Sequence, residues 1–463
     1  MAISLSTGLG SGIDVQSMVS QLVSAERTPA TQRLDALKTK LTTQISSLGS
    51  IKSALSGFQS TLADLKKTST FQNLKATVAD EKQFTATTDS DSTAGSYNIL
   101  VNNLAQAQRL VTAADPTLTS TTSQIGTGTL SIQVGSAEAQ SVTVTDGSLT
   151  GVRDAINNAK IGVTANLVKD GSSYRLVVGA NDTGAANGLT ITVSGDGDDN
   201  NSDNSGLSRL TYNSAGTKNM TETAAAKDSQ IVVDGLTLNS ASNTIKDVIP
   251  GVTLSLKAKG DTATSLAVAQ DASGVTTKLE AFVKSYNDLM SNVKSATAYN
   301  PTTKTGGTLI GDSVVRSTVS QVRDVVSSSV AEATGDYKML ADIGISMQRD
   351  GTLALDATKL KTALAANTDG VASVFTAGTT GIAQRLDSAL TKILGSDGPL
   401  ASRTDSLNRQ VKDIGNQRNT LDLRMAALEK IYFTKFSAMD QLVSGLNNTS
   451  SYLASQLSGL SSS

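Results

Sequence analysis

The 463-residue chain contains no cysteine, no histidine and no tryptophan. Without Cys and His, zinc, copper, iron–sulfur and haem sites lose their usual ligands, and thiol or Ser–His nucleophilic chemistry is excluded. Only carboxylates, Lys and Tyr remain for proton transfer. We therefore expect a protein that is not an enzyme and that uses no cofactor. Hydrolysis by paired carboxylates is the alternative that composition leaves open, but no such pair stands out.

An excess of charge and a long apolar run are also missing. The chain has 39 basic and 41 acidic residues, a formal charge of -2, and no Lys/Arg cluster. We therefore expect no nucleic-acid partner. No stretch approaches the roughly 18 apolar residues of a spanning helix, so we expect no membrane partner. The opening residues 1–11 are Ser- and Gly-rich without an apolar block, so no Sec-type signal is predicted and any export uses another route.

What the sequence does contain is an apolar repeat of seven residues at both ends. A seam of this kind stays apolar only if another helix covers it. The inner rows of the two ends are predicted to pair with each other as a stalk. These rows consist of Leu34, Leu41, Leu48, Leu55, Leu62, Leu407, Ile414 and Leu421.

The outer parts of the two ends are predicted to contact other subunits. Phe433 and Phe436 lie off the main seam, and a second apolar face on one helix implies more neighbours than a two-helix pair supplies. A purely internal core is the alternative. Gln44, Arg418 and Lys435 interrupt the seams, and we expect them to set register and to moderate the contacts. The predicted oligomer or filament interface consists of Val15, Met18, Val19, Leu22, Leu428, Tyr432, Phe433, Phe436, Met439, Leu446 and Leu453.

The N-terminal end is predicted to contain two helices. Asp14 is a good N-cap for a short amphipathic helix from Val15 to Glu26. Thr28-Pro29 is then expected to restart the chain, since Pro is favoured at the first position of a helix. A long helix follows to about Lys67.

Between the two ends, short alternating apolar runs flanked by turn formers predict many short strands. One helix is expected around Leu149 to Ala159, and helical spacing returns from Val275 with a hairpin at Asp350-Gly351. The predicted fold class is α+β multidomain: a helical, coiled-coil-like stalk built from both termini, with an inserted β-rich head of two β domains. The expected division is 1–40 (leg arm and helix), 41–74 (stalk helix), 75–273 (head), 274–405 (helical stalk domain) and 406–463 (C-terminal leg helix). Within the head, 75–108 with 229–273 form one domain and 109–228 the second.

Two short motifs suggest ligand sites but depart from the required patterns. Gly8-Leu9-Gly10-Ser11-Gly12 precedes a helix, but no strand precedes it and no Lys follows, so a flexible arm is preferred to a phosphate loop. Asp196-Gly197-Asp198-Asp199-Asn200 begins like a calcium loop, but Asn201 and Leu207 occupy the positions of the required Gly and Glu. A solvated acidic loop is the preferred interpretation, and weak calcium binding over 196–203 stays open.

Several segments, in order along nearly the whole chain, resemble the flagellar filament cap family, also called the hook-associated protein 2 family. Each motif is weak alone, whereas the ordered set is specific. The matching segments are Gly8–Asp14, Ala94–Val101 with Leu104–Ala107, Asp234-Gly235-Leu236 through Pro250-Gly251-Val252-Thr253-Leu254, Asp342–Ile345 and Phe436–Asp440. Val152–Asn157 with Val163-Thr164-Ala165 also resembles a repeat of flagellins and other hook-associated proteins. A flagellin or a hook–filament junction protein is therefore the nearest alternative.

The resemblance implies a function and partners. The expected function is structural: capping the filament tip, promoting flagellin insertion and preventing flagellin loss. Secretion through the flagellar type III apparatus and a ring-like homo-oligomer, expected to be a pentamer, are implied. Flagellin, the hook-associated junction protein and an export chaperone are the implied partners. A tip adhesin that binds host glycans through the β-rich head is a further alternative.

Overall fold

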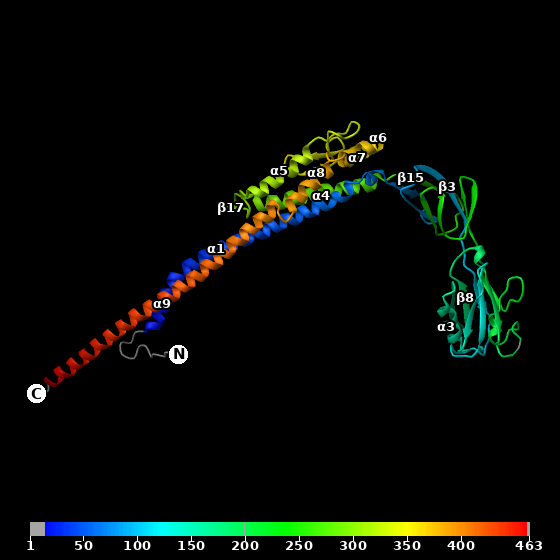
Figure 1. Ribbon diagram of the computed structural model, residues 1–463, viewed down its shortest axis with the longest axis horizontal. Coiled ribbons are helices and arrows are strands. Elements are labelled where there is room, and N and C mark those ends of the chain that lie inside the picture. The colour runs from blue at the N-terminus through cyan, green and yellow to red at the C-terminus, as the bar shows by residue number, and fades with distance from the viewer. Residues whose placement is uncertain (1–13, 199, 461–463) are drawn as a thin grey trace. The chain divides into compact units, whose positions relative to one another are not determined.

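The computed structural model describes residues 14–198 and 200–460, which form two compact units (Figure 1). The helical unit combines the chain before residue 72 with the chain after residue 271, and the β unit is residues 72–271. The expected fold class, a helical stalk from both termini with a β-rich insert, is confirmed. None of the described helices combines the length and apolar character that a membrane crossing requires.

The helical unit is built around two long helices from opposite ends of the chain. The first has 51 residues and the last 62. Shorter helices and two small hairpins complete the unit. Its elements are α1 (Val15–Leu65), α2 (Thr68–Gln72), α4 (Ala272–Thr297), β16 (Tyr299–Asn300), β17 (Thr305–Gly306), α5 (Ser313–Ser327), β18 (Ile345–Met347), β19 (Leu353–Leu355), α6 (Ala357–Ala366), α7 (Thr368–Thr376), α8 (Ile382–Leu394) and α9 (Pro399–Leu460).

The main core of the helical unit lies where the second half of α1 packs against α4 and α8. Phe58 is fully buried, and its ring lies 5.3 Å from that of Phe282 and 5.8 Å from that of Tyr286. The Tyr286 hydroxyl donates to the Gly351 carbonyl at 3.1 Å, which ties the β18–β19 turn to α4. This core anchors one end of the α1–α9 pair.

The first β domain of the β unit has a five-stranded and a three-stranded sheet around one core. The strand orders are β1-β15-β3-β11-β12 and β13-β14-β2, all antiparallel. Asp234 and Gly235 both have positive φ, 46° and 88°, as the tight β11–β12 turn requires. The strands are β1 (Leu74–Val78), β2 (Phe84–Thr88), β3 (Gly95–Asn103), β11 (Ser229–Val233), β12 (Leu236–Ser240), β13 (Thr244–Ile249), β14 (Val252–Leu256) and β15 (Thr264–Gln270).

The second β domain has its own core between two further antiparallel sheets and one helix. The sheets are β10-β4-β8-β7 and β6-β5-β9. The helix begins after Ser148, whose hydroxyl accepts the Gly151 amide at 2.9 Å, and it buries Val152 and Ile156. The elements are β4 (Arg109–Thr112), β5 (Gly128–Val134), β6 (Gln140–Val144), α3 (Leu149–Ala159), β7 (Val163–Asp170), β8 (Ser173–Ala180), β9 (Leu189–Ser194) and β10 (Met220–Ala224), with 3₁₀ turns at Ala185–Asn187 and Gly206–Leu210.

The expected restart of the N-terminal helix at Thr28-Pro29 is wrong. The helix α1 continues from Val15 to Leu65 with Pro29 inside it. The Thr28 hydroxyl donates to the Ser24 carbonyl at 2.7 Å, so Thr28 acts as a helix-interior residue and not as an N-cap. Packing of α1 along α9 on both sides of Pro29 outweighs the local preference of proline for a helix start. The helix also crosses the expected boundary at residues 40 and 41 without a break.

We predict that Phe58→Ala destabilises the helical unit by about 3–5 kcal/mol, because a large aromatic side chain leaves a cavity in a packed core. Hydrogen exchange of the α1 and α4 amides in the full chain measures this loss. Leu446→Ala is the control because Leu446 is exposed on α9, and its effect should stay within about 0.5 kcal/mol. Equal protection of α4 in the two variants would contradict the prediction.

A second prediction concerns acid and the β unit. The Thr117 hydroxyl and amide, and then the Arg209 guanidinium at 3.0 Å, lower the pKa of Asp115 from 3.8 to about 2. A lowered pKa stabilises the fold above the unfolded value and loses that contribution as pH falls from about 4 to about 2. Asp115→Asn should therefore flatten the acid loss of β-unit stability in that window, measured by urea unfolding at several pH values. Asp182→Asn, at an exposed position, should leave the pH dependence of the β-unit stability unchanged.

Candidate functional site: the paired terminal helices

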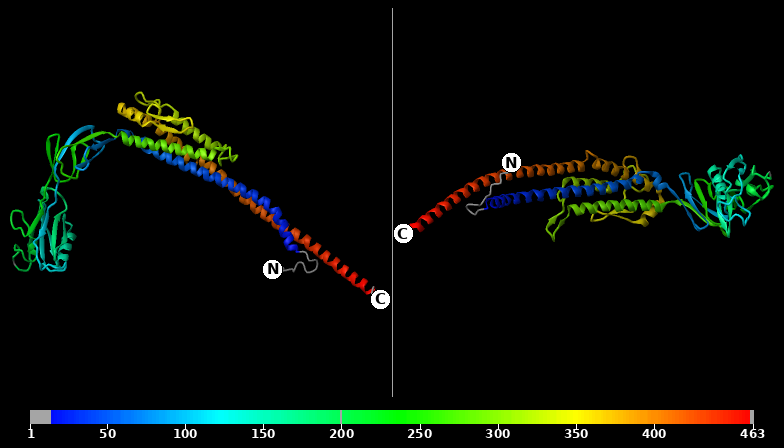
Figure 2. Two further views of the ribbon diagram at one scale, coloured as in Figure 1. Left: turned by 180° about the vertical axis from the view of Figure 1, so that it is seen from behind. Right: turned by 90° about the horizontal axis from the view of Figure 1, so that it is seen from below.

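The first half of α1 lies antiparallel along α9 (Figure 2). Asp14 caps α1, its carboxylate accepting the Ser17 amide at 2.9 Å. Two ion pairs join the helices: Arg27 to Asp422, and Asp35 to Arg418 at 2.6 Å. As residue numbers rise along α1 they fall along α9, which fixes the antiparallel register.

A small apolar cluster closes the outer part of this pair. Val15, Val19 and Val23 recur every four residues, so they share one face of α1. They are buried together with Met425 of α9. Partly buried residues of α9 pack around them: Leu421, Leu428, Tyr432, Phe433 and Phe436. Burying each such aliphatic side chain contributes about 1.5–3 kcal/mol, so this cluster outweighs the ion pairs beside it.

The interval between this cluster and the main core combines exposed ion pairs with apolar contacts, since Ile414 of α9 is buried there and Leu34 of α1 is partly buried. The side chains of Arg27, Asp422, Asp35 and Arg418 are 44–52% exposed, and exposed ion pairs contribute about 0–1 kcal/mol each. Leu37, in the same interval, is exposed. The ion pairs therefore select the register of the helices, whereas the apolar residues on either side supply most of the stability.

The structure distributes the predicted interface residues over two environments. Val15 and Val19 are buried against α9, and Leu428, Tyr432, Phe433 and Phe436 are partly buried by α1. These six contact their own chain. The predicted residues that stay exposed are Met18, Leu22, Met439, Leu446 and Leu453.

The predicted stalk residues lie along the whole of the α1 seam, in two different environments. Leu34 and Leu41 are partly buried, and Leu407 and Ile414 of α9 are buried. Leu48, Leu55 and Leu62 belong to the main core together with Leu407, and this core also contains Leu279 of α4 and Leu386 of α8. Because α9 begins only at Pro399, these shorter helices cover the second half of the α1 seam.

Two of the three seam interruptions have partners within the chain. The Gln44 side-chain amide donates to the Thr308 carbonyl at 3.1 Å. Arg418 pairs with Asp35, in line with a role in register. Lys435 is exposed on α9.

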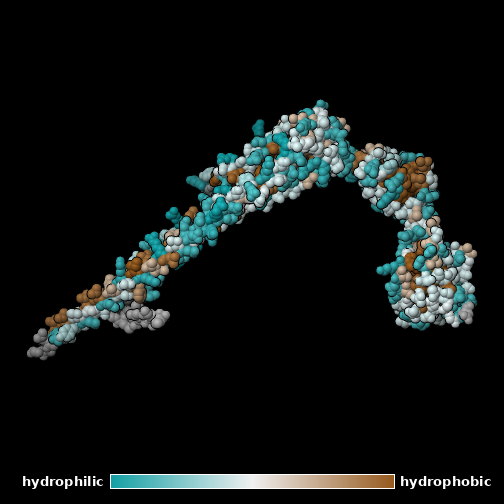
Figure 3. All heavy atoms as spheres, viewed as in Figure 1, coloured by the Kyte–Doolittle hydropathy of each residue, from teal (hydrophilic) through white to brown (hydrophobic). Residues whose placement is uncertain are grey.

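The part of α9 beyond the small cluster exposes a row of large apolar side chains. Every described residue from Gly445 to Ser458 is exposed. Large apolar side chains lie among them and just before them: Leu442 (70% exposed), Leu446 (68%), Tyr452 (63%), Leu453 (54%) and Leu457 (66%). Figure 3 shows hydrophobic side chains along this end of α9. Leu442, Tyr452 and Leu457 were missing from the predicted interface, and Leu457 lies outside the heptad phase.

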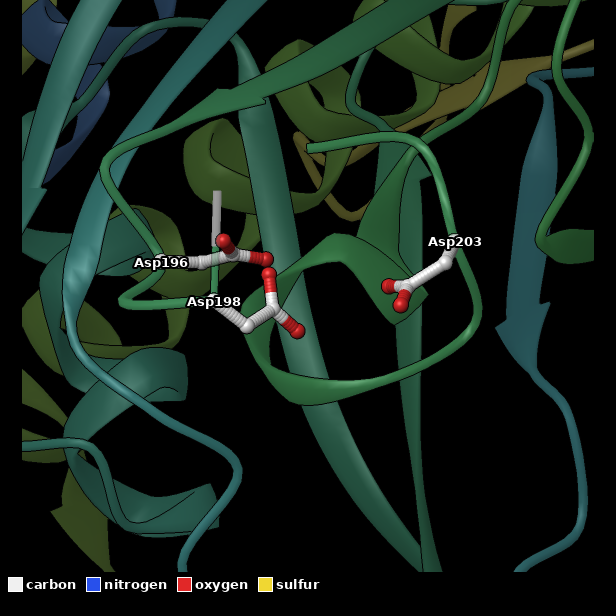
Figure 4. A group of neighbouring side chains, drawn as sticks. All are labelled: Asp196, Asp198 and Asp203. Atoms are coloured by element: carbon white, nitrogen blue, oxygen red, sulfur yellow. The ribbon is translucent and has the colours of Figure 1, made fainter. Parts of the chain in front are cut away.

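The acidic loop brings three carboxylates together, as Figure 4 shows. Oxygens of Asp196, Asp198 and Asp203 lie within 4.8 Å of one another. Asp196 accepts the Ser208 hydroxyl, and this bond, ahead of the contacts with Asp198, lowers the pKa of Asp196. The lowered pKa keeps the Asp196 carboxylate ionised, and a solvated acidic loop stays the prediction for this segment.

The cavity between α4, α5 and the β18–β19 turn has a volume of about 840 Å³ and contains acidic groups. Asp312 caps α5 and pairs with Arg403 at 2.9 Å. The Thr352 hydroxyl and amide lower the pKa of Asp350, which keeps this carboxylate ionised. Asp324, the third acidic residue of the lining, accepts the Ser320 hydroxyl at 3.4 Å, so each of the three carboxylates has a partner within the fold. The Gly8–Gly12 motif lies outside the described residues.

Comparison with known proteins places this arrangement in a family. The sequence models of the flagellar hook-associated protein 2 N-terminus and C-terminus match residues 11–108 and 226–448. The A-type flagellar hook-associated protein 2 of Pseudomonas aeruginosa is 36% identical over 98% of this chain and 97% of its own length. The chain belongs to the flagellar hook-associated protein 2 family. The expected resemblance is confirmed.

Further similar proteins support the same family assignment. The flagellar hook-associated protein 2 of Escherichia coli K12 is 33% identical and is covered over the full length of both chains. The crystal structure of the D1-D2-D3 domains of the flagellar cap protein FliD from Escherichia coli is similar with a TM-score of 0.62 and 34% identity, covering 78% of this chain and 99% of that one. Residues 109–225, between the two matched segments, contain the second β domain.

We predict that Val19→Asp opens the outer part of the α1–α9 pair, because a buried carboxylate without a partner costs several kcal/mol. Amides of residues 15–26 should lose at least about tenfold in hydrogen-exchange protection. Ser20→Asp places the same charge on the exposed neighbouring position and should preserve protection. Equal protection in both variants would show that the small cluster does not hold the helices together.

Proposed function

We propose that this chain is the structural protein that caps the tip of a bacterial flagellar filament, where it promotes insertion of exported flagellin and prevents flagellin loss. The observation that carries the proposal is an exposed apolar stripe on α9, formed by Leu442, Leu446, Leu453 and Leu457, in a member of this family. The solved Escherichia coli relative is described as a flagellar cap protein. Assembly, and not chemistry, is then the activity, and the chain works after export, outside the cell.

The physical basis is the burial of the α9 stripe. A soluble protein rarely exposes a contiguous row of large apolar side chains unless a partner covers it. Covering each leucine contributes about 1.5–3 kcal/mol, so a few of them suffice to retain a cap. The contact involves no covalent step and no cofactor, which allows the cap to be released and reseated as subunits are added.

The finer assignments belong to this proposal. Met18, Leu22, Met439, Leu446 and Leu453 are the predicted residues available to a neighbour. Flagellin is the proposed partner of the exposed stripe during growth, and the hook-associated junction protein its partner before growth begins. A ring-like homo-oligomer, with five copies as the expected number, and an export chaperone complete the set. A tip adhesin that binds host glycans through the β unit stays the alternative to this proposal.

The test replaces Leu446 and Leu453 together by Ser in the full chain, expressed in a strain that lacks the native gene. Losing two apolar contacts should weaken retention at the tip, shorten filaments and raise the amount of monomeric flagellin in the medium at least about tenfold. Leu236→Ser is the matched control, since Leu236 is a 69% exposed leucine of the β unit. Normal filaments with the double variant would refute the proposed role of the stripe.

A further inference from the structure

The helix α9 changes in composition where its own-chain cover ends. Residues 399–440 contain twelve charged residues: Arg403, Asp405, Arg409, Lys412, Asp413, Arg418, Asp422, Arg424, Glu429, Lys430, Lys435 and Asp440. Residues 441–458, which we name the uncharged segment, contain none. The α1 cluster packs against α9 only as far as Phe436. The charged residues of α9 therefore end within one or two helical turns of the point where α1 stops packing against it.

An exposed helix that has leucines but no charged side chains is poorly solvated. Charged side chains keep a helix surface soluble and support it through pairs three or four residues apart. Around its leucines the uncharged segment offers Ser, Asn, Thr, Gln and Gly, and its other apolar residues are Val443, Tyr452 and Ala454. An isolated helix of this length is marginal, so this composition suits a buried helix better than a solvated one.

The leucines of the uncharged segment form one stripe. At 100° per residue, Leu442, Leu446, Leu453 and Leu457 lie within about 60° of one another around the axis. The stripe continues the face that α1 covers earlier along α9, where Leu421 and Leu428 are partly buried at about 60° and 40° from Leu442 around the axis. An established helix–helix interface thus extends onto a part of the helix where α1 no longer reaches.

The absence of charge restricts the partner. A partner that brought Lys, Arg, Asp or Glu against this segment would bury a charge with no counter-ion, which costs several kcal/mol. Neutral hydroxyl and amide side chains, by contrast, can exchange water for hydrogen bonds at little net cost. The chemistry that complements the segment is an apolar helical seam bordered by small uncharged polar residues.

We propose that the uncharged segment docks along an uncharged, apolar helical seam of the filament subunit, and that this contact is independent of salt. The inference rests on the proposed capping function and specifies the chemistry of its contact. Register within the chain is set by the two ion pairs of the α1–α9 pair, whereas attachment to the filament uses shape and apolar burial alone.

The test measures binding of the full chain to the ends of filaments polymerised in vitro from purified flagellin, by co-sedimentation between 0.05 and 1 M NaCl. The expected affinity changes less than about threefold across this range, since screening acts only on charged contacts. A loss of tenfold or more at high salt would overturn the inference and leave the capping function standing. If the full chain bound filament ends at no salt concentration, both the inference and the proposed capping function would be overturned.

Lysine substitutions on the two sides of the uncharged segment test which side contacts the filament. Ser450 and Gln456 border the stripe at about 80° and -40° from Leu442, whereas Asn448 and Ser451 lie on the opposite side of the helix; all four are exposed. Ser450→Lys with Gln456→Lys should weaken binding at least tenfold. Asn448→Lys with Ser451→Lys, which adds the same charge, should weaken it less than threefold.

Equal losses for the two pairs would overturn the assignment to the stripe. If sedimentation of the protein alone instead showed concentration-dependent self-association that only the Ser450–Gln456 pair abolished, the occupant would be a second copy and not the filament. Binding of the protein to neutral lipid vesicles that the Ser450–Gln456 pair of substitutions abolished would likewise overturn the proposed partner.

Discussion

The packing of α1 on α9 is the interaction on which the helical unit depends. It joins segments from opposite ends of the chain, so that the β unit becomes an insert between them. The apolar residues supply the stability: the cluster around Val19 at one end and the core around Phe58 at the other. The ion pairs between these two regions are exposed and weak, but they are directional, and they align seams that would otherwise slide by a heptad.

The sequence was sufficient to predict the elements whose causes are local. The helix at 149–159 begins at a serine that caps it, and the Asp350-Gly351 turn joins two short strands. The seven-residue repeat likewise predicted that both ends are long helices. Each of these depends on residues a few positions apart, which a single sequence displays.

The errors arose where distant packing outweighs local preference. Pro29 favours a helix start, but the α9 contacts on both sides of it maintain a continuous helix. The heptad of α1 shows only that something covers it, and α4 and α8 cover the half that contains Leu55 and Leu62. Likewise, periodicity did not separate Val19, buried by α9, from Leu446, which is exposed. The available signal in the sequence was that the charged residues of α9 stop at Asp440. This position marks where α9 is no longer packed against its own chain and is free to contact a partner.

The antiparallel pairing has a consequence for the order in which the chain folds. Arg27 and Asp422 are 395 residues apart in sequence, whereas every contact inside the β unit closes within residues 72–271. Closing a loop slows as the separation grows, so the β domains can fold as soon as they emerge from a channel or a ribosome. The first half of α1 must wait, without its partner, until α9 arrives. The earliest residues of the helical unit to appear are thus among the last to acquire a native environment, and the joining of the two ends is the event that completes the molecule.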